Sequence, residues 1–390
     1  MSRLRELIAE LCPDGVEYKA LGELLDYEQP GKYIVASTDY SDEYSVPVLT
    51  AGKGLLLGYT DETEGVYVAS DDDPVIIFDD FTTSFHWITY NFKVKSSAMK
   101  MLRPTPDCSY CMFRYAYYAM KNIDYAPESH TRQWIGTYSA FRIPVPPLEV
   151  QREIVRILDE YTAAHDELVR KLEEEMELRG QQLSIARNEM CMKEEWPLEA
   201  IGNVFTTITG GTPKKSNTDY YGDNHPFYKP GDLVHGTVVS SAEDGLTDEG
   251  LASTRSVPPS SILMTCIGSI GKAAMVSVLG SCNQQINAVL PRDGVNMSFY
   301  LHVLCSDYFQ KQVMTRGSFG NMPILSRGKF DKLLVPVPPL DVQDKVASVL
   351  DGLSGAINES LSLLREELSI QEQSLSGVRN ELLSFPEKVA

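Results

Sequence analysis

The chain has 390 residues, of which 43% are apolar, and its formal net charge is −19. That length and apolar content suffice for two or three hydrophobic cores, whereas the excess of acid argues against a general nucleic-acid binder with a basic surface. The N-terminal residues lack the apolar run of a signal peptide, and no stretch approaches the ~18 apolar residues of a membrane span. Seven cysteines, an odd number, suit a reducing compartment better than a disulfide framework. These features predict a cytoplasmic protein.

A short N-terminal helix over residues 1–15 is the first predicted element, and a first domain over residues 16–143 follows it. Apolar runs bounded by glycine and aspartate predict strands at 75–78 and 87–92, with a short helix over 111–121. This segment carries 11 basic and 18 acidic residues. If such a domain contacts DNA, its few cations must gather on one face.

The segment 144–189 returns as 336–381 without a gap, with 20 identities in 46 positions. Both copies open with Pro-Val-Pro-Pro-Leu-x-Val-Gln, which cannot be helical throughout because proline lacks the N–H and restricts the preceding residue. Each copy then shows apolar residues spaced alternately by three and four, as in Leu350, Leu353 and Ile357. This period is typical of a coiled-coil seam. We expect two helices of about 40 residues, roughly 60 Å each, paired antiparallel within the chain. The alternative is two ordinary amphipathic helices on separate domains.

Between the copies, residues 144–195 form the first repeat region and residues 196–335 a second domain, while 336–390 form the second repeat region. The second domain is neutral, with 11 basic and 11 acidic residues. Strands are predicted at 261–266 and 286–290, and a helix at 299–313. The fold class predicted from these patterns is α+β: two globular α/β domains and two long helices in an antiparallel intramolecular coiled coil, arranged as a pseudo-twofold internal repeat.

Signatures of catalysis are weak throughout the sequence. Gly268–Lys272 resembles part of a phosphate-binding loop, but Cys266 stands where the first glycine is required and Ala273 where serine or threonine is required. Cys108 and Cys111 form a lone C-x-x-C without a second pair at zinc spacing. Asp79 and Asp80 close an apolar strand and would need further converging carboxylates to hold a catalytic metal. We therefore predict no catalytic residue and no metal site in this chain.

Taken together, the motifs resemble those of the specificity (S) subunit of type I restriction–modification systems. The resemblance spans essentially the whole length and rests on the two Pro-Val-Pro-Pro-Leu-x-Val-Gln strips with their long helices, and on the Asn-Glu pairs at 188–189 and 380–381. The second domain adds GGTPKK at 210–215, YKPGDL at 228–233, IGSIGK at 267–272 and CNQQI at 282–286. The first adds LTAGKG at 49–54, VIIFDDFT at 75–82 and FKVKSS at 92–97.

That resemblance implies a non-catalytic subunit with two target-recognition domains, each of which reads half of a bipartite asymmetric site on double-stranded DNA. The coiled coil would set the unread spacer. The implied partners are two methyltransferase subunits and, in the full complex, two restriction subunits. S-adenosylmethionine would be held by the methyltransferase partner, ATP and Mg by the restriction partner, and no cofactor by this chain. Basic partner surface would also explain how so acidic a chain binds DNA.

Candidate DNA-contacting residues follow from the side chains that read base edges and phosphates: Arg, Lys, Asn, Gln, Ser and Thr. The alternative for each is an ordinary surface polar side chain, or, near Trp134, the flank of a packed tryptophan. In the second domain the candidates are Thr212, Lys214, Lys215, Ser269, Lys272, Gln284, Gln285 and Arg316. In the first domain they are Lys53, Thr83, Ser84, His86, His130, Arg132 and Gln133.

Two other functions stay open on the sequence alone. A fused enzyme would show a metal-dependent activity on DNA in the purified chain. A bivalent protein-binding scaffold, favoured by the acidity, would show no binding to mixed-sequence DNA that weakens steeply with salt.

Overall fold

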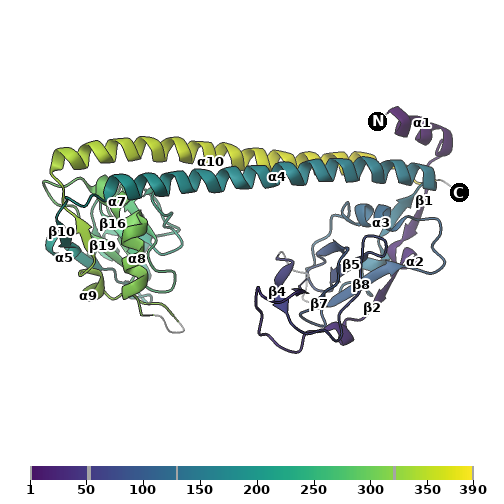
Figure 1. The fold of residues 1–390 in the computed structure, drawn as a ribbon, viewed down its shortest axis with the longest axis horizontal. Coiled ribbons are helices and arrows are strands. Elements are labelled where there is room, and N and C mark those ends of the chain that lie inside the picture. Colours follow the sequence, from purple (N-terminus) through teal and green to yellow (C-terminus); the bar gives the residue numbers. More distant parts are fainter. Residues whose placement is uncertain (1, 51–53, 129–130, 319–321, 389–390) are drawn as a thin grey trace. The chain divides into compact units, whose positions relative to one another are not determined.

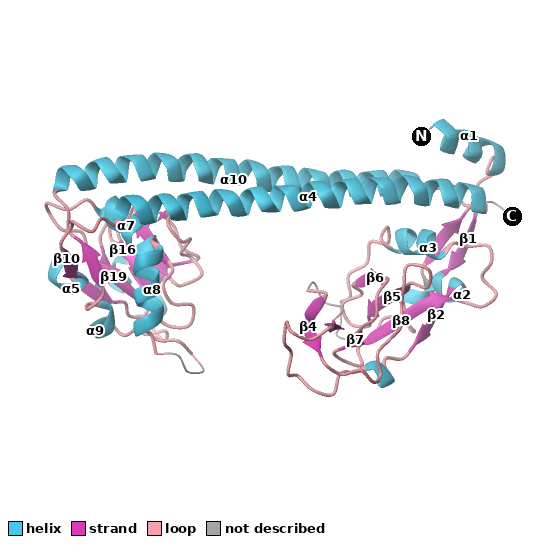
Figure 2. Cartoon of the chain, viewed as in Figure 1, coloured by secondary structure: helices cyan, strands magenta, loops and turns pink. Residues whose placement is uncertain are grey.

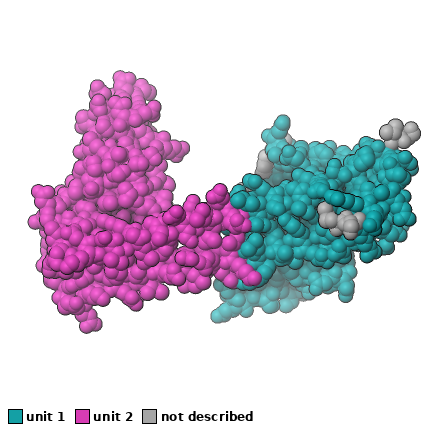
Figure 3. Space-filling model, turned by 90° about the horizontal axis from the view of Figure 1, so that it is seen from above, with its two compact units in different colours: residues 1–170, 368–390 teal, residues 171–367 magenta. Residues whose placement is uncertain are grey.

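A computed structural model describes residues 2–50, 54–128, 131–318 and 322–388 (Figure 1). The chain divides into two compact units (Figure 3). Unit 1 comprises residues 1–170 and 368–390, and unit 2 comprises residues 171–367. Each unit therefore contains one globular domain and one part of each long helix.

The long helices are α4, Leu148–Cys191, and α10, Leu340–Leu382, with 44 and 43 residues. Each helix begins directly after the Pro-Pro of its strip. The N–H groups at the start of a helix have no partner within the helix, so proline, which lacks an N–H, loses no hydrogen bond there. In unit 1 the hydroxyls of Tyr161 and Ser374 lie 2.7 Å apart, and in unit 2 Cys191 and Leu350 are buried in the same cluster. The two helices run antiparallel (Figure 2), as the sequence predicts.

Unit 1 has a main antiparallel sheet in the order β2-β8-β5-β6 and a smaller sheet in the order β4-β3-β7. In the smaller sheet β3 and β7 are parallel. A separate antiparallel pair, β1 with β9, joins the start of the domain to its end. The elements are α1 Ser2–Leu11, β1 Glu17–Ala20, α2 Leu21–Leu24, β2 Leu25–Glu28, β3 Val46–Leu49, β4 Leu56–Thr60, β5 Val75–Asp79, β6 Phe85–Ile88, β7 Lys93–Val94, β8 Met99–Pro104, α3 Phe113–Met120 and β9 Arg142–Val145, with 3₁₀ turns at Gly31–Tyr33 and Tyr138–Ala140.

Unit 2 has a main sheet in the order β11-β19-β16-β17-β13 and a second sheet in the order β14-β12-β18-β15. The pair β10 with β20 again joins the start of the domain to its end. The elements are β10 Leu198–Ala200, α5 Ile201–Val204, β11 Thr207–Thr209, β12 Tyr221–Tyr228, β13 Val238–Val239, β14 Asp244–Leu246, α6 Asp248–Ala252, β15 Ser256–Val257, β16 Ile262–Thr265, β17 Ala273–Val276, β18 Gly280–Cys282, β19 Ile286–Val289, α7 Met297–Cys305, α8 Asp307–Arg316, α9 Arg327–Phe330 and β20 Leu334–Pro336, with a 3₁₀ turn at Thr218–Tyr220.

The two domains share most of their strand topology although their sequences look unlike, and the second domain adds β13 and β15 to the shared strands. The order β2-β8-β5-β6 matches β11-β19-β16-β17, and both four-strand sets are antiparallel throughout. The second sheets match as well, because β3 pairs antiparallel with β4 and parallel with β7, as β12 does with β14 and β18. The internal repeat therefore extends through the inserts, and the predicted fold class is confirmed.

The glutamine that ends each proline strip fastens the strip to its domain. Gln151 and Gln343 are both buried. Their amide N–H groups donate to the carbonyls of Pro146 and Pro338, at 2.7 and 2.8 Å. Their side-chain oxygens accept the backbone N–H of Met112 and of Asn296, which lie just before α3 and α7. The same bonds in both copies explain why the repeat retains this residue.

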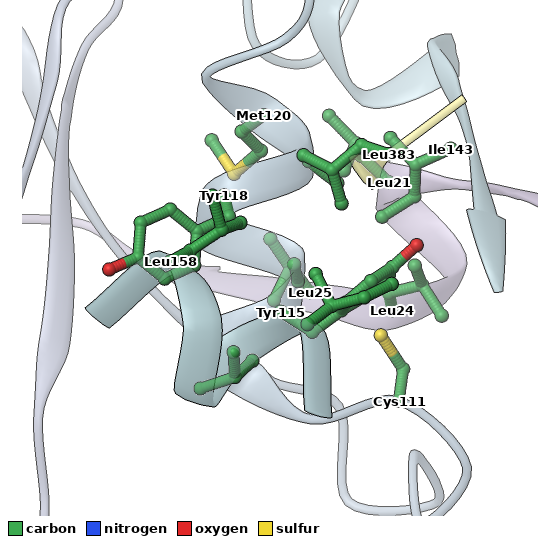
Figure 4. Packing of buried hydrophobic residues seen from close by; sticks show 14 of the residues in the cluster. Leu21, Leu24, Leu25, Cys111, Tyr115, Tyr118, Met120, Ile143, Leu158 and Leu383 are labelled. Carbon is green, nitrogen blue, oxygen red and sulfur yellow. The ribbon is translucent and has the colours of Figure 1, made fainter. Parts of the chain in front are cut away.

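In unit 1 one hydrophobic core lies between the domain and the two helix ends, and a second lies among the strands of the domain. Tyr115 of α3 and Leu158 of α4 are fully buried in the first core, with Leu383 just beyond α10 (Figure 4). The final residues also pair with the start of the domain, since Val16 N–H donates to the Pro386 carbonyl at 3.0 Å. Gly15 makes this approach possible: its φ is +91°, and a Cβ there would lie 2.5 Å from that carbonyl oxygen.

Three predicted elements differ from the structure by more than two residues or in number. The strand predicted at 87–92 lies at Phe85–Ile88. The helix predicted at 299–313 is two helices, which separate at Ser306 because its side chain caps α8 by accepting from the Phe309 N–H. The N-terminal helix ends at Leu11. Among the described residues, no helix combines the length and apolar character that crossing a membrane requires.

Candidate nucleic-acid interface

Four loops of the second domain meet at one end of the main sheet. Because β11, β19, β16 and β17 are antiparallel neighbours, the end of β11 at Thr209, the start of β19 at Ile286, the end of β16 at Thr265 and the start of β17 at Ala273 lie together. Three loops leave the sheet there, residues 210–217, 266–272 and 283–285, and a fourth, residues 322–326, is hydrogen-bonded to them. We call these four loops the second loop edge. This arrangement places polar side chains from distant parts of the sequence side by side.

Backbone hydrogen bonds hold the first of these loops against the third. Gly210 N–H donates to the Ile286 carbonyl at 3.0 Å, and Gly211 N–H donates to the Cys282 carbonyl at 2.9 Å. A Cβ on Gly210 would lie 2.2 Å from the carbonyl oxygens of Cys282 and Asn283. Only glycine fits at position 210, which accounts for the start of the GGTPKK motif.

A buried asparagine links the sheet to the fourth loop. The Asn287 side chain accepts from the Thr209 hydroxyl at 2.7 Å and donates to the Leu325 carbonyl at 3.2 Å. Cys266 adds two backbone bonds, since its N–H donates to the Gln285 carbonyl at 2.7 Å and its carbonyl accepts the Leu325 N–H at 2.8 Å. The four loops thus form one hydrogen-bonded frame.

The first domain has the same frame at the matching strand ends. Asp80 takes the place of Cys266: its N–H donates to the Ala98 carbonyl at 2.8 Å, and its carbonyl accepts the Gln133 N–H at 2.8 Å. Lys100 takes the place of Asn287, because the sheet pairs Phe78 with Lys100 and Met264 with Asn287. The loops 80–84, 95–98 and 131–134 meet here and form the first loop edge.

A buried ion pair stabilises the first loop edge. Lys100 Nζ lies 3.1 Å from Asp80 Oδ2, and both side chains are fully buried. Asp80 Oδ1 accepts the backbone N–H of Trp134 at 2.8 Å, while Arg132 lies 3.8 Å from the same carboxylate at the surface. Asp80 is therefore a structural residue that fixes the loop containing Trp134, and not part of an exposed acidic cluster.

The family of the chain follows from comparison with known proteins. The profile of the type I restriction modification DNA specificity domain matches residues 13–178 and 193–368. The chain belongs to this family. It is 35% identical to the Escherichia coli type I restriction enzyme EcoR124I/EcoR124II specificity subunit, over 99% of this chain and 98% of that one. A second relative, the HindI specificity subunit of Haemophilus influenzae, is 30% identical over 44% of this chain and 40% of its own.

A solved structure supports the fold of this specificity subunit. A chain from a structural study of complex assembly and conformational transition in a type I restriction–modification system superposes with a TM-score of 0.65, at 15% identity, covering 96% of this chain and 98% of that one. Membership in the family makes the chain a non-catalytic specificity subunit that recognises a DNA target. In the described residues no three His, Cys, Asp or Glu side chains gather as a metal site would require.

The second loop edge brings two predicted residues of the specificity subunit into contact. Thr212 donates through its hydroxyl to Gln284 Oε1 at 2.6 Å, and both residues are exposed. Lys214 and Lys215 are exposed in the same loop, and Ser269 is exposed in the 266–272 loop. A joined hydroxyl and amide with neighbouring ammonium groups can meet a base edge and the adjacent phosphates.

The other three predicted residues of the second domain have internal partners. Gln285 is half-buried and accepts from the Asn283 side chain at 3.0 Å. Lys272 Nζ donates to the Pro230 carbonyl at 3.2 Å. Arg316, at the end of α8, donates to the Lys332 carbonyl. Their role in DNA contact stays a prediction.

In the first domain the structure joins two clusters that are 50 residues apart in sequence. Thr83 and Ser84 lie in the turn between β5 and β6, and Arg132 and Gln133 lie in the loop that Asp80 fastens to that turn. Thr83 is largely buried, with φ of +58°. His86 lies in β6 rather than in a loop, while Lys53 and His130 lie outside the described residues.

Gln133 and Trp134 are both buried. The Gln133 side chain accepts from the Tyr125 hydroxyl at 2.7 Å and donates to the Thr131 carbonyl at 2.8 Å. The alternative of a packed tryptophan therefore holds for Trp134. Arg132, whose side chain is 49% exposed, is the predicted residue of this loop that the structure presents at the surface.

The matching frames reveal candidate residues that the sequence did not select. Ser96 and Ser97 are exposed in the loop that corresponds to the one with Gln284, and Gln29 is exposed just after β2, at the position that strand pairing aligns with Thr209. The FKVKSS motif contains both serines. Aligning the two domains by strand pairing, instead of by residue identity, is the signal that finds them.

Proposed function

We propose that the two loop edges read the two halves of a bipartite asymmetric site on double-stranded DNA, one half each. The observation that carries this proposal is the shared hydrogen-bonded frame, which presents different exposed side chains in the two domains: Thr212 and Gln284 in one, Ser96, Ser97 and Arg132 in the other. One scaffold with two sets of polar side chains suits a protein that reads two different short sequences.

The remaining assignments are part of the same proposal. The domains extend over 16–143 and 196–335, after an N-terminal segment 1–15, and the repeat regions 144–195 and 336–390 carry the helices that set the unread spacer. Two methyltransferase subunits, with S-adenosylmethionine, and two restriction subunits, with ATP and Mg, bind to this chain. The complex works in the cytoplasm, in keeping with seven cysteines that are all free thiols.

The experiment that tests this proposal is a genome-wide map of methylated adenines in a strain carrying the chain with its methyltransferase, compared with the same strain lacking this chain. We expect one asymmetric motif of two short blocks to disappear with the chain. A second strain carries Thr212→Val with Gln284→Ala, and a control strain carries Gln181→Ala on the exposed surface of α4. The double variant should relax one block only, and the control neither. Relaxation of both blocks would contradict one half-site per domain.

A further inference from the structure

One position in each loop edge is equivalent by its hydrogen bonds but carries a very different side chain. At the first loop edge the Asp80 carbonyl accepts the N–H of the residue after Arg132, at 2.8 Å. At the second loop edge the Cys266 carbonyl accepts the N–H of the residue after Ile324, also at 2.8 Å. Arg132 and Ile324 therefore occupy the same place in the frame, although one is cationic and the other apolar.

This position lies across the strand end from an exposed polar residue in each domain. The Asp80 N–H donates to the carbonyl of the residue after Ser97 at 2.8 Å, and the Cys266 N–H donates to the carbonyl of the residue after Gln284 at 2.7 Å. Ser97 and Gln284 are exposed, as are the two residues on the opposite side. Each strand end is thus flanked by two exposed side chains, one from each neighbouring loop.

Hydrogen bonds within each loop hold the backbone at this position. Around Arg132, the side-chain amide of Gln133 donates to the Thr131 carbonyl at 2.8 Å and to the Thr131 hydroxyl at 3.1 Å. Ile324 exchanges two backbone bonds with Ser318, because its N–H donates at 3.0 Å and its carbonyl accepts at 2.9 Å. A side chain on a fixed backbone can discriminate between bases, since its end is held at a defined place.

The Asp80 carboxylate orients the guanidinium of Arg132. Nη1 of Arg132 lies 3.8 Å from Oδ2 of Asp80, and the carboxylate is fully buried whereas the arginine side chain is 49% exposed. At this distance the two groups form an ion pair that is longer than a hydrogen bond. Lys100, at 3.1 Å, already neutralises the same carboxylate. An exposed arginine that is oriented in this way suits the bidentate contact with O6 and N7 of guanine.

Ile324 is an apolar residue at an edge whose exposed residues are mostly polar. Its exposed fraction is 42%, and that of Met322, two residues earlier, is 56%. In the major groove the C5-methyl group of thymine is read by apolar contact. Ile324 therefore suits a thymine in the way that Arg132 suits a guanine.

We propose that this position determines specificity in both half-sites: Arg132 reads a guanine in one, and Ile324 contacts the C5-methyl group of a thymine in the other. The inference rests on the proposed function, which assigns one half-site to each loop edge. Each contact depends on one atom or group of its base, so each can be removed from the DNA without changing the protein.

Base analogues test the inference on the complex of the full-length chain with its methyltransferase. Synthetic duplexes carry the mapped target site with one guanine replaced by 7-deazaguanine, which lacks N7, or one thymine replaced by uracil, which lacks the methyl group. At one guanine of the first domain's block, 7-deazaguanine should raise Kd roughly twofold to tenfold at fixed salt, about half the free energy of a bidentate contact. At one thymine of the other block, uracil should raise Kd roughly fourfold, the effect of one buried methyl group.

Two variants assign these effects to the two residues. Arg132→Met should bind the guanine and 7-deazaguanine duplexes with equal Kd, and Ile324→Ser should do the same for the thymine and uracil duplexes. Each variant is the control for the other, because it should keep the discrimination that the other loses. Ile370→Ser, which changes a residue of α10 that is 51% exposed, should keep both. A variant that merely lowers the amount of folded complex leaves these ratios of Kd unchanged.

Several outcomes would overturn the inference and leave the proposed function in place. If Arg132→Met weakens binding to both duplexes by the same factor, Arg132 contacts a phosphate or supports the loop. If uracil changes Kd at no position and Ile324→Ser weakens binding to the methyltransferase, Ile324 belongs to a protein contact. A first block without a G·C pair, or a second block without an A·T pair, has the same consequence. If the wild-type complex does not prefer the mapped site over mixed-sequence DNA, the proposed function falls and the inference with it.

Discussion

The buried pair of Lys100 and Asp80 allows a quantitative test of the first loop edge. Replacing Lys100 by methionine keeps the volume and removes the positive charge 3.1 Å from Asp80 Oδ2. The carboxylate then stays fully buried, with one backbone N–H from Trp134 and the guanidinium of Arg132 at 3.8 Å. Breaking a buried ion pair on one side destabilises a protein by about 3–5 kcal/mol. For a unit of this size we expect a drop in melting temperature of roughly 6–20 °C.

The assay is urea unfolding followed by tryptophan fluorescence, with Trp134 next to the pair as a local probe. Lys345→Met is the matched control, because Lys345 lies 3.2 Å from Asp341 with a side chain that is 78% exposed. An exposed pair of this kind contributes less than about 1 kcal/mol. The double variant D80N/K100M should recover most of the loss, since neither charge remains buried and the amide oxygen still accepts from the Trp134 N–H. If K100M unfolds at the same urea concentration as K345M, the buried pair does not stabilise the loop edge.

Three further perturbations test other parts of the structure. Gly210→Ala should destabilise the second domain by about 1–3 kcal/mol, because its Cβ would overlap two carbonyl oxygens. The control is Gly231→Ala, whose Cβ would meet nothing within 4 Å, and it should change the free energy of unfolding by less than about 0.5 kcal/mol. Thermal unfolding measures both. Burial lowers the pKa of His302 below its ordinary 6.5, so the unfolded chain binds more protons than the folded chain. The free energy of unfolding should therefore fall as the pH drops below about 6.5. His302→Asn should make the free energy of unfolding less dependent on pH, as measured by urea titrations at pH 5 to 8. Replacing Lys214 and Lys215 by glutamine should reduce the slope of log K against log salt by about 2, measured on complexes with mixed-sequence DNA, if both contact phosphates.

The long helices and the proline strips could be predicted from the sequence because their signals are local and repeated. The three-four spacing around Leu350 and Ile357 specifies a seam whichever partner covers it, and prolines fix where each helix begins. In the sequence, Gln151 and Gln343 stand out only because the two copies of the repeat have glutamine at the same position. Their role requires the tertiary contact of Gln151 with Met112, 39 residues away, which no local pattern encodes.

Parts of the candidate site could not be predicted, because charged and polar residues are expected at the surface and several of them are buried here. Lys100 and Asp80 look like surface charges in a sequence, and Gln133 looks like a reader of adenine, yet all three are buried. Their burial depends on strand register, which places Lys100 opposite Phe78 and next to the Asp80 carboxylate. The exposure of Thr212 and Gln284 was easier to predict, because a glycine-led polar loop is rarely a core element. Their contact with DNA stays a prediction.

The two loop edges show how one frame tolerates two unlike sequences. The bonds that hold the loops together run through backbone groups at Asp80 and Cys266, so the side chain at that position can be a carboxylate or a thiol. The buried polar group one strand away differs accordingly: Lys100 neutralises Asp80 in one domain, whereas Asn287 bonds to Thr209 and Leu325 in the other. Each domain therefore needs buried polar groups whose partners lie within the same domain, and the two domains do not need the same residues for this. The exposed loop residues lie outside these buried groups, which leaves them able to change without loss of the frame, as a subunit that reads different DNA sequences requires.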